Sequence, residues 1–238
     1  MGKPLIMLHG FMSNKESFYY QIAYFKNFRR VVAIDITSFG NSKKMQSAYA
    51  LDDYVNDILN VINELNLSCY DILAHSFGGR IAIKLANIDS RLQKLILTGS
   101  AGLKPKRKLK YYIKVYSYKL LKKLFPKSKL KRFGSSENRV LSGLEKQSYV
   151  KIVNCFLDND AKKITNETLL VFGKTDAETP LYMAKKFNKL IKNYSEFEGE
   201  LTISPMPSTT LNKISIKLSD DLTIIDTPGL VNRGNIIN

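Results

Sequence analysis

Ala74-His75-Ser76-Phe77-Gly78-Gly79 is the stretch that decides the fold, because it joins a short buried strand to a helix. The apolar run at 70–73 is typical of a strand, and 80–86 has helical spacing. Positions 74–78 fit the pattern G-x-S-x-G, with Ala74 in place of the first glycine. This pattern holds a serine above a sheet on a tight turn, where small neighbours are needed because the backbone is strained and closely packed.

The rest of the chain repeats the alternation of strand and helix. Strands are expected at 4–8, 31–34, 70–73, 94–97 and 168–172, and helices at about 15–26, 51–65, 80–86 and 181–192. Residues 103 to about 160 interrupt this order and read as a mostly helical insertion. The pattern predicts an α/β fold with a mostly parallel sheet, helices on both faces and a helical lid.

Length and composition set the bounds on this fold. The 238 residues allow one α/β domain or one domain plus a fragment, and 44% hydrophobic content suffices for a core. No apolar run reaches 18 residues, and the first residues lack the layout of a signal peptide. Cys69 and Cys155 form no metal or redox spacing. These features predict a cytoplasmic protein with two free thiols.

The net charge of +16 is concentrated in one segment. Residues 103–132 hold 13 Lys or Arg and no Asp or Glu, with apolar side chains at helical spacing between them. This segment is interpreted first as the solvated face of a lid helix. The alternatives are an anionic membrane surface or nucleic acid. Nucleic acid ranks last because no phosphate-binding or base-stacking motif accompanies the basic run.

Four local motifs, in order, resemble the α/β-hydrolase family over about residues 3–195. They are the oxyanion-loop motif Leu8-His9-Gly10-Phe11, the loop of Asp35 with Phe39-Gly40-Asn41-Ser42, the turn at Ser76, and the acid loop Phe172-Gly173-Lys174-Thr175-Asp176 through Thr179-Pro180. The resemblance implies that Ser76 is the nucleophile and Asp176 the carboxylate that orients a histidine. The backbone N–H groups of Phe11 and Phe77 would form the oxyanion hole, each contributing about 3 kcal/mol to the transition state.

The resemblance also implies supporting residues and a class of substrate. Gly10, Gly78, His9 and His75 would support the loops around the nucleophile, with His9 fixing the oxyanion loop by a hydrogen bond. The substrate would be a small acyl compound, namely a carboxylic ester, thioester or amide. No metal or organic cofactor is implied. Met12 and the lid tyrosines at 111, 112, 116 and 118 are candidates for an acyl pocket, although such spacing more often means core packing.

The histidine of the expected Ser-His-Asp triad has no counterpart in the chain. The family order puts it near residues 200–206, and no histidine follows His75. His75 is expected to point to the other side of the turn from Ser76, and His9 belongs to the oxyanion loop. We therefore expect weak or no activity from this chain.

The C-terminal segment resembles a different family. From about 201 to 238 it is similar to part of a circularly permuted ribosome-assembly GTPase, with a switch-I-like segment at 208–211 and a strand and D-x-x-G loop at 222–230. No phosphate-loop motif G-x-x-x-x-G-K-[ST] occurs in the chain, which argues against GTP binding. The expected division is a hydrolase-like domain at 1–198, with its lid at about 103–160, and a foreign or disordered tail at 199–238. Such a chimeric or truncated gene product would have a sheet that is incomplete at both ends.

Two rival functions remain. Haloalkane or epoxide chemistry on the same fold needs a carboxylate nucleophile at the turn, and Ser76 argues against it. A non-catalytic protein that binds anionic membranes through 103–132 is the alternative from another class.

Overall fold

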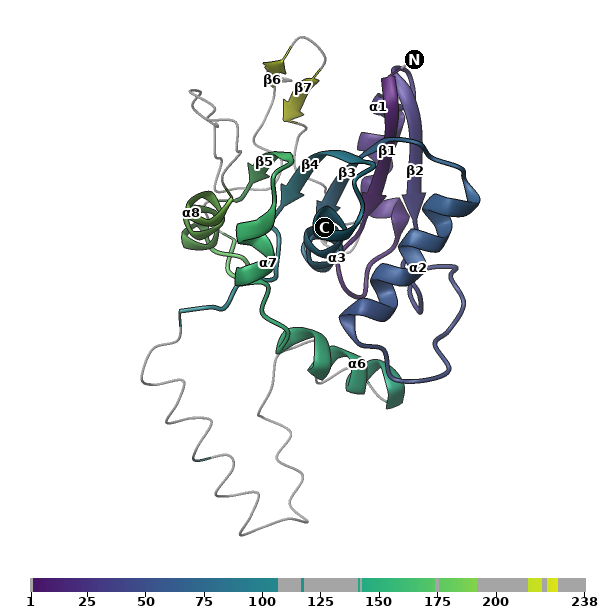
Figure 1. Cartoon of the computed structure of the whole chain (residues 1–238), viewed down its shortest axis with the longest axis vertical. Helices are drawn as coiled ribbons and strands as arrows, with labels where there is room; N and C mark the ends of the chain where they lie inside the picture. The colour runs from purple at the N-terminus through teal and green to yellow at the C-terminus, as the bar shows by residue number, and fades with distance from the viewer. Residues whose placement is uncertain are drawn as a thin grey trace, which may run out of the picture.

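A five-stranded sheet forms the centre of the protein (Figure 1). The computed structural model describes residues 2–106, 117, 141, 143–173, 176–191, 214–219 and 222–226, and only the backbone of the last two ranges. The strands are β1 (Gly2–Leu8), β2 (Arg29–Ile34), β3 (Tyr70–His75), β4 (Leu92–Thr98) and β5 (Glu167–Val171), in the order β2-β1-β3-β4-β5. All four pairings are parallel, which confirms the expected fold class.

Helices cover both faces of this sheet, because its strands are apolar on both sides. Alternate residues of β1 belong to two separate cores: Ile6 and Leu8 to one, Leu5 and Met7 to the other. The larger core lies under α2 (Leu51–Glu64), α3 (Phe77–Ile88) and α8 (Leu181–Leu190). The smaller core lies under the 3₁₀ helix η1 (Lys15–Phe18) and α1 (Tyr19–Phe25).

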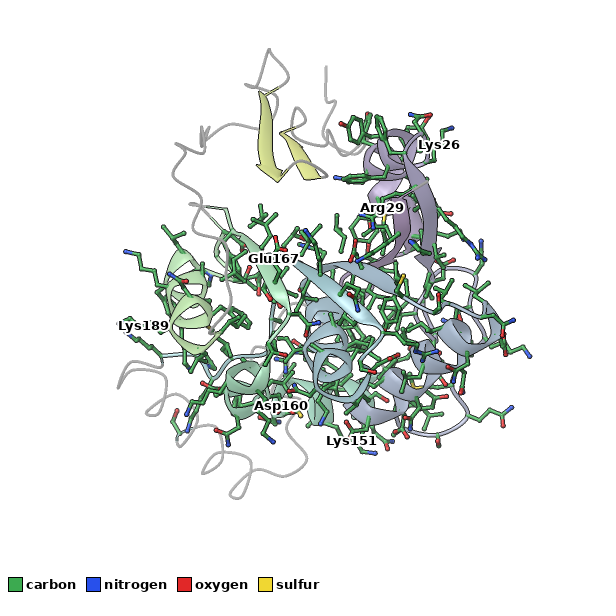
Figure 2. All side chains as sticks on the ribbon, turned by 45° about the horizontal axis from the view of Figure 1, so that its top comes forward. Lys26, Arg29, Lys151, Asp160, Glu167 and Lys189 are labelled. Atoms are coloured by element: carbon green, nitrogen blue, oxygen red, sulfur yellow. The ribbon has the colours of Figure 1, made fainter. Side chains whose placement is uncertain are left out.

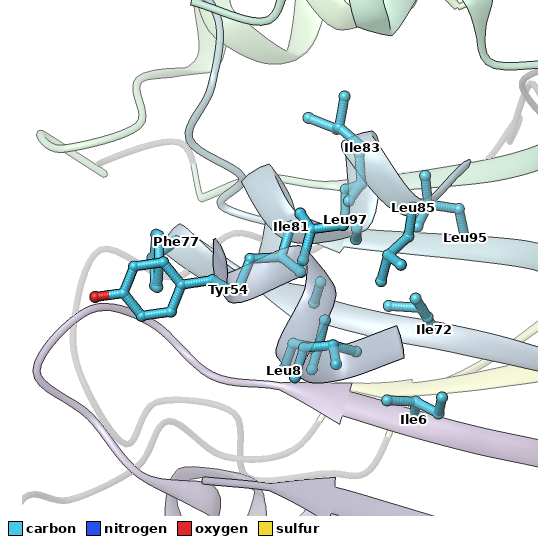
Figure 3. Packing of buried hydrophobic residues seen from close by; sticks show 14 of the residues in the cluster. Ile6, Leu8, Tyr54, Ile72, Phe77, Ile81, Ile83, Leu85, Leu95 and Leu97 are labelled. Carbon is cyan, nitrogen blue, oxygen red and sulfur yellow. The ribbon is translucent and has the colours of Figure 1, made fainter. Parts of the chain in front are cut away.

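The helix α3 is the buried element of the larger core. Figure 3 shows its side chains Phe77, Ile81 and Leu85 among those of the strands, and all three are less than 4% exposed. Tyr54 of α2 packs edge-on against the Phe77 ring, with centroids 5.1 Å apart. Because α3 follows Ser76 directly, this packing fixes the turn that carries the serine.

Many charged side chains lie at the outer surface of the fold, whereas Asp71, Arg80 and Asp89 are buried. Lys189 of α8 and Lys26 after α1 lie at the outer surface in Figure 2, and both are exposed. One charged pair is buried instead: Arg29 at the start of β2 bonds the carboxylate of Asp71 in β3, and both side chains are largely covered. That carboxylate also accepts a hydrogen bond from the Lys94 N–H at 3.0 Å, so it ties three strands together.

Two helices described in the region 103–160 are α6 (Gly143–Val153) and α7 (Asp158–Lys163). The remaining expectations for the lid, including its basic segment and its tyrosines, fall mainly on 107–140, outside the described residues apart from Ser117. In the tail, β6 (Ile214–Ser219) and β7 (Leu222–Asp226) form an antiparallel pair. The strand expected at the start of 222–230 corresponds to β7, while 208–211 and 227–230 lie outside the described residues.

Candidate active site

Ser76 lies on a strained turn between β3 and α3. Its φ is 49° and its ψ is −107°, a backbone conformation that residues other than glycine rarely adopt. The surrounding backbone holds it there. The Ser76 N–H donates to Thr98 O at 3.1 Å, and its carbonyl accepts from the N–H groups of Gly79 and Ala101, both at 3.1 Å. The turn expected from G-x-S-x-G is therefore present, with the serine at its apex.

The two glycines after the turn are required by close contacts, Gly78 with backbone and Gly79 with a side chain. A Cβ on Gly78 would lie 2.2 Å from the carbonyl oxygen of Leu8, and one on Gly79 would lie 2.1 Å from Ser100 Oγ. The Gly78 N–H donates to His9 O at 3.1 Å. The start of α3 thus rests directly on the end of β1, which brings the oxyanion-loop motif beside Ser76.

The resemblance assigns the oxyanion hole to Phe11 and Phe77, which lie next to each other in the structure. Their rings stack edge-on with centroids 5.4 Å apart, and both residues line one cavity with Ser76. Within the described ranges, neither backbone N–H donates to a protein acceptor. Two N–H groups beside a serine can bind the negative oxygen that develops when an acyl carbonyl is attacked.

His9, directly after β1, makes two hydrogen bonds with backbone groups. Its Nε2 accepts a hydrogen bond from the Ile36 N–H at 3.0 Å, and its Nδ1 donates to Gly10 O at 2.7 Å. These partners determine a neutral ring with the proton on Nδ1, since an N–H can only donate and a carbonyl can only accept. Burial lowers the pKa of His9, which favours the same neutral form. Both ring nitrogens are therefore occupied by structural bonds.

Asp176 follows β5 and faces the same cavity as Ser76. One carboxylate oxygen accepts from the N–H groups of Glu178 (2.8 Å) and Thr179 (3.0 Å), and the other accepts from Thr179 Oγ1 at 2.6 Å. Burial alone would raise the pKa of Asp176. The hydrogen bonds from Thr179 and Glu178 hold that pKa below its usual value. Asp176 is thus an oriented and ionised carboxylate.

His75 differs from the sequence expectation. We expected its side chain to point away from Ser76, yet the ring is exposed at the cavity that Ser76 and Asp176 line. The cause is the pairing of His75 with Thr98 of β4, where the His75 Nδ1 donates to Thr98 O at 3.0 Å. A Cβ on Gly99 would lie 3.4 Å from both His75 Cε1 and Asp176 Oδ2, so these two atoms are at most twice that distance apart. The other ring nitrogen, Nε2, makes no hydrogen bond within the described ranges.

The cavity over these residues has a volume of about 650 Å³, enough for a small organic substrate. Two of its polar lining residues were not singled out from the sequence. In the sequence, Arg80 is only the first residue of the helix expected at 80–86, and Gln21 is only part of the helix expected at about 15–26. A cation four residues after Ser76, at the start of a helix whose next residues are apolar, is the signal that would have found Arg80. Met12, a candidate for the acyl pocket, is 45% exposed and does not line the cavity.

The part of the chain that the structure describes bears on two kinds of feature, a metal-ligand cluster and a membrane-spanning helix. There, no group of three or more His, Cys, Asp or Glu side chains is arranged to hold a metal ion. Among the described helices, none combines the length and apolar character needed to cross a bilayer.

Comparison with known proteins gives one family and several relatives. The sequence model of the alpha/beta hydrolase fold family matches residues 3–122. Epoxide hydrolase 4 of Mus musculus is 28% identical over 235 aligned positions, which cover 81% of this chain and 65% of that protein. The solved structure of an esterase from Exiguobacterium antarcticum has a TM-score of 0.63 and 26% identity, with 81% of each chain covered. Several curated relatives are matched over less than two thirds of their own length, from 28% to 65%.

The family match ends before the C-terminal segment. The resemblance of 201–238 to a GTPase therefore stays a prediction, as do the domain boundary near 198 and the membrane contact through 103–132.

Proposed function

This chain belongs to the alpha/beta hydrolase fold family, and on that premise we propose that it is a serine hydrolase acting on a carboxylic ester, thioester or amide. The observation that carries the proposal is the strained Ser76 turn in a cavity of about 650 Å³ that an oriented carboxylate also lines. Strain of this kind persists only where the surrounding structure holds it, and it is concentrated at functional sites.

The proposed reaction follows from the positions of these groups. Ser76 Oγ attacks the acyl carbonyl carbon while its proton passes to His75 Nε2, and the carbonyl oxygen becomes negative between the N–H groups of Phe11 and Phe77. When this intermediate collapses, the bond to the leaving group breaks, the leaving group takes the proton from His75 and departs as the alcohol, thiol or amine, and the acyl group stays on Ser76. Water then releases the acid and restores the serine.

The proposed mechanism requires a general base that takes the proton of Ser76. The chain has two histidines, and both nitrogens of His9 are taken by structural bonds. If a histidine of this chain acts as the base for Ser76, it is therefore His75. A Cβ added to Gly10 would lie 3.8 Å from His75 Nε2 and 3.5 Å from Ser76 Cβ. Both side chains therefore lie beside the backbone of Gly10. No hydrogen bond joins His75 to Ser76 within the described ranges, so we expect slow turnover.

Epoxide chemistry is the neighbouring alternative, since epoxide hydrolase 4 is among the relatives. On this fold that chemistry needs a carboxylate at the position of Ser76. The serine at the apex of the turn therefore favours acyl transfer.

Hydrolysis of p-nitrophenyl butyrate by the full chain tests the proposal. We expect slow release of nitrophenol that Ser76→Ala abolishes and His75→Gln reduces about tenfold or more. Ser90→Ala, which makes the same change on the exposed surface after α3, should retain the wild-type rate. A Ser76→Ala chain as active as the wild type would overturn the proposal.

A further inference from the structure

Arg80 is a buried cation in the wall of the cavity. It lies on the first turn of α3, one turn after Ser76, and it is only 8% exposed. The cavity that Ser76 lines is also lined by Arg80, together with Tyr149 and Ile152 of α6. Arg80 therefore borders the space beside the serine.

Most of the N–H donors of Arg80 are not used by its hydrogen bonds to the described part of the protein. A guanidinium has five N–H donors. Nη1 donates to Ile152 O at 3.0 Å and to Cys155 O at 2.7 Å, which uses both of its hydrogens. The three donors on Nη2 and Nε have no hydrogen-bond acceptor within the described ranges.

The charge of Arg80 is also uncompensated by the described part of the chain. The ionisable side chains that act on it there are Cys155 and Tyr149, and neither is a carboxylic acid. Asp176 and Glu178 line the same cavity, but the Asp176 carboxylate is already bound by Thr179 and Glu178. Buried charges in proteins are almost always paired, because an unpaired charge loses its hydration without gaining a partner.

We propose that Arg80 binds a carboxylate on the acyl part of the substrate, so that the site takes a half-ester, half-thioester or half-amide of a short dicarboxylic acid. This inference rests on the proposed function, because Ser76 must attack the carbonyl at one end of the acyl group while Arg80 binds the carboxylate at its other end. The donors on Nε and Nη2 form the planar fork that matches the two oxygens of a carboxylate.

The charge of the site favours a carboxylate over a phosphate monoester. One guanidinium neutralises one carboxylate, whereas a dianionic phosphate would bring an excess negative charge into a wall lined by Phe77, Tyr149 and Ile152. The carbonyl oxygens that Arg80 already binds would repel that excess charge further.

Direct binding tests the inference without turnover. Monomethyl glutarate and dimethyl glutarate are titrated calorimetrically into the full-length Ser76→Ala chain, which cannot form an acyl intermediate. The two ligands differ by one methyl group and one negative charge. We expect the monoester to bind about tenfold or more tightly than the diester. Methyl phosphate, offered in a third titration, should bind more weakly than the monoester.

Two further variants assign this preference to Arg80. Adding Arg80→Gln should abolish the preference for the monoester, whereas Lys84→Gln, which removes a cation one turn later that faces Asp52 and Asp160, should retain it. Arg80→Lys keeps the charge without the fork, so it should retain part of the preference, and it replaces Arg80→Gln if that variant does not fold. Equal affinity for the two glutarates, or a preference that survives Arg80→Gln, would overturn the inference. Covalent labelling of Ser76 by a fluorophosphonate in the wild-type chain does not depend on Arg80. A failure of the carboxylate site can therefore be told apart from a failure of the serine chemistry.

Discussion

Replacing Gly78 with alanine tests how the start of α3 rests on β1. On helix propensity alone, alanine inside a helix is about 1 kcal/mol more favourable than glycine. The structure predicts the opposite sign. The new Cβ would lie 2.2 Å from Leu8 O, 2.7 Å from Leu8 C and 2.8 Å from Leu8 Cβ. Real Cβ atoms do not come closer than 3.0 Å, so α3 and β1 would have to separate by the 0.8 Å between 2.2 and 3.0 Å.

The strand cannot yield at this point, which sets the magnitude. Leu8 is fully buried and pairs with Ile34 of β2 and Ala74 of β3. Overpacking of a rigid core costs about 1–3 kcal/mol, and here the contact is with backbone, so we expect a loss of about 3 kcal/mol in the free energy of unfolding. For a chain of this size that corresponds to a fall of roughly 6–12 °C in melting temperature.

Urea denaturation of the wild type, Gly78→Ala and Gly143→Ala measures this effect. Gly143 has a φ of 56° and no atom within 4 Å of an added Cβ, so alanine there costs only about 1 kcal/mol of backbone strain. The Gly78 variant should also lose nitrophenyl ester hydrolysis, since its shift moves the N–H groups of Phe11 and Phe77 apart. A Gly78→Ala chain as stable as the wild type, or no less stable than Gly143→Ala, would refute this close approach.

Three further predictions concern buried charges and the site. Burial lowers the pKa of His9 below its model-compound value of 6.5, so the unfolded chain binds a proton that the folded chain does not as the pH falls below 6.5. The free energy of unfolding should therefore decrease from pH 7 to pH 5 more steeply in the wild type than in His9→Gln, and equal slopes would contradict the burial of a neutral ring. Arg29→Met leaves the Asp71 carboxylate buried without its partner and should cost about 3 kcal/mol in urea unfolding. Lys94→Met, which removes a pair with a more exposed carboxylate, should cost less than about 1 kcal/mol, and similar losses for the two would count against a buried pair. Asp176→Asn should slow ester hydrolysis about tenfold or more with little change in melting temperature, and an unchanged rate would remove Asp176 from the mechanism.

The sequence was sufficient for the sheet because its strands are nearly continuous apolar runs. Tyr70–His75 and Leu92–Thr98 extend the expected strands by one to three residues and keep their order. The helix expected at 15–26 is divided, since its first turn, Lys15–Phe18, is 3₁₀ and only Tyr19–Phe25 is α-helical. Hydrophobic spacing does not distinguish a 3₁₀ turn from an α-helical one over four residues.

The sequence could not predict the positions of side chains that depend on strand pairing or on contacts between residues far apart in the chain. The ring of His75 faces the cavity because β3 pairs with β4 so that His75 lies opposite Thr98. Arg80 bonds carbonyls 72 and 75 residues away in the chain, a contact that no local pattern encodes. Ser76, by contrast, was identified because its turn is specified by its immediate neighbours, including the two glycines that permit the close approach.

Labelling with a fluorophosphonate, read by intact mass, tests the central claim most directly, since the reagent modifies only an activated serine. We predict one adduct on the wild-type chain and on Ser90→Ala, none on Ser76→Ala, and a slower adduct on His75→Gln. A folded wild-type chain that stays unlabelled, or an adduct that persists in Ser76→Ala, would contradict the assignment of Ser76 as the nucleophile.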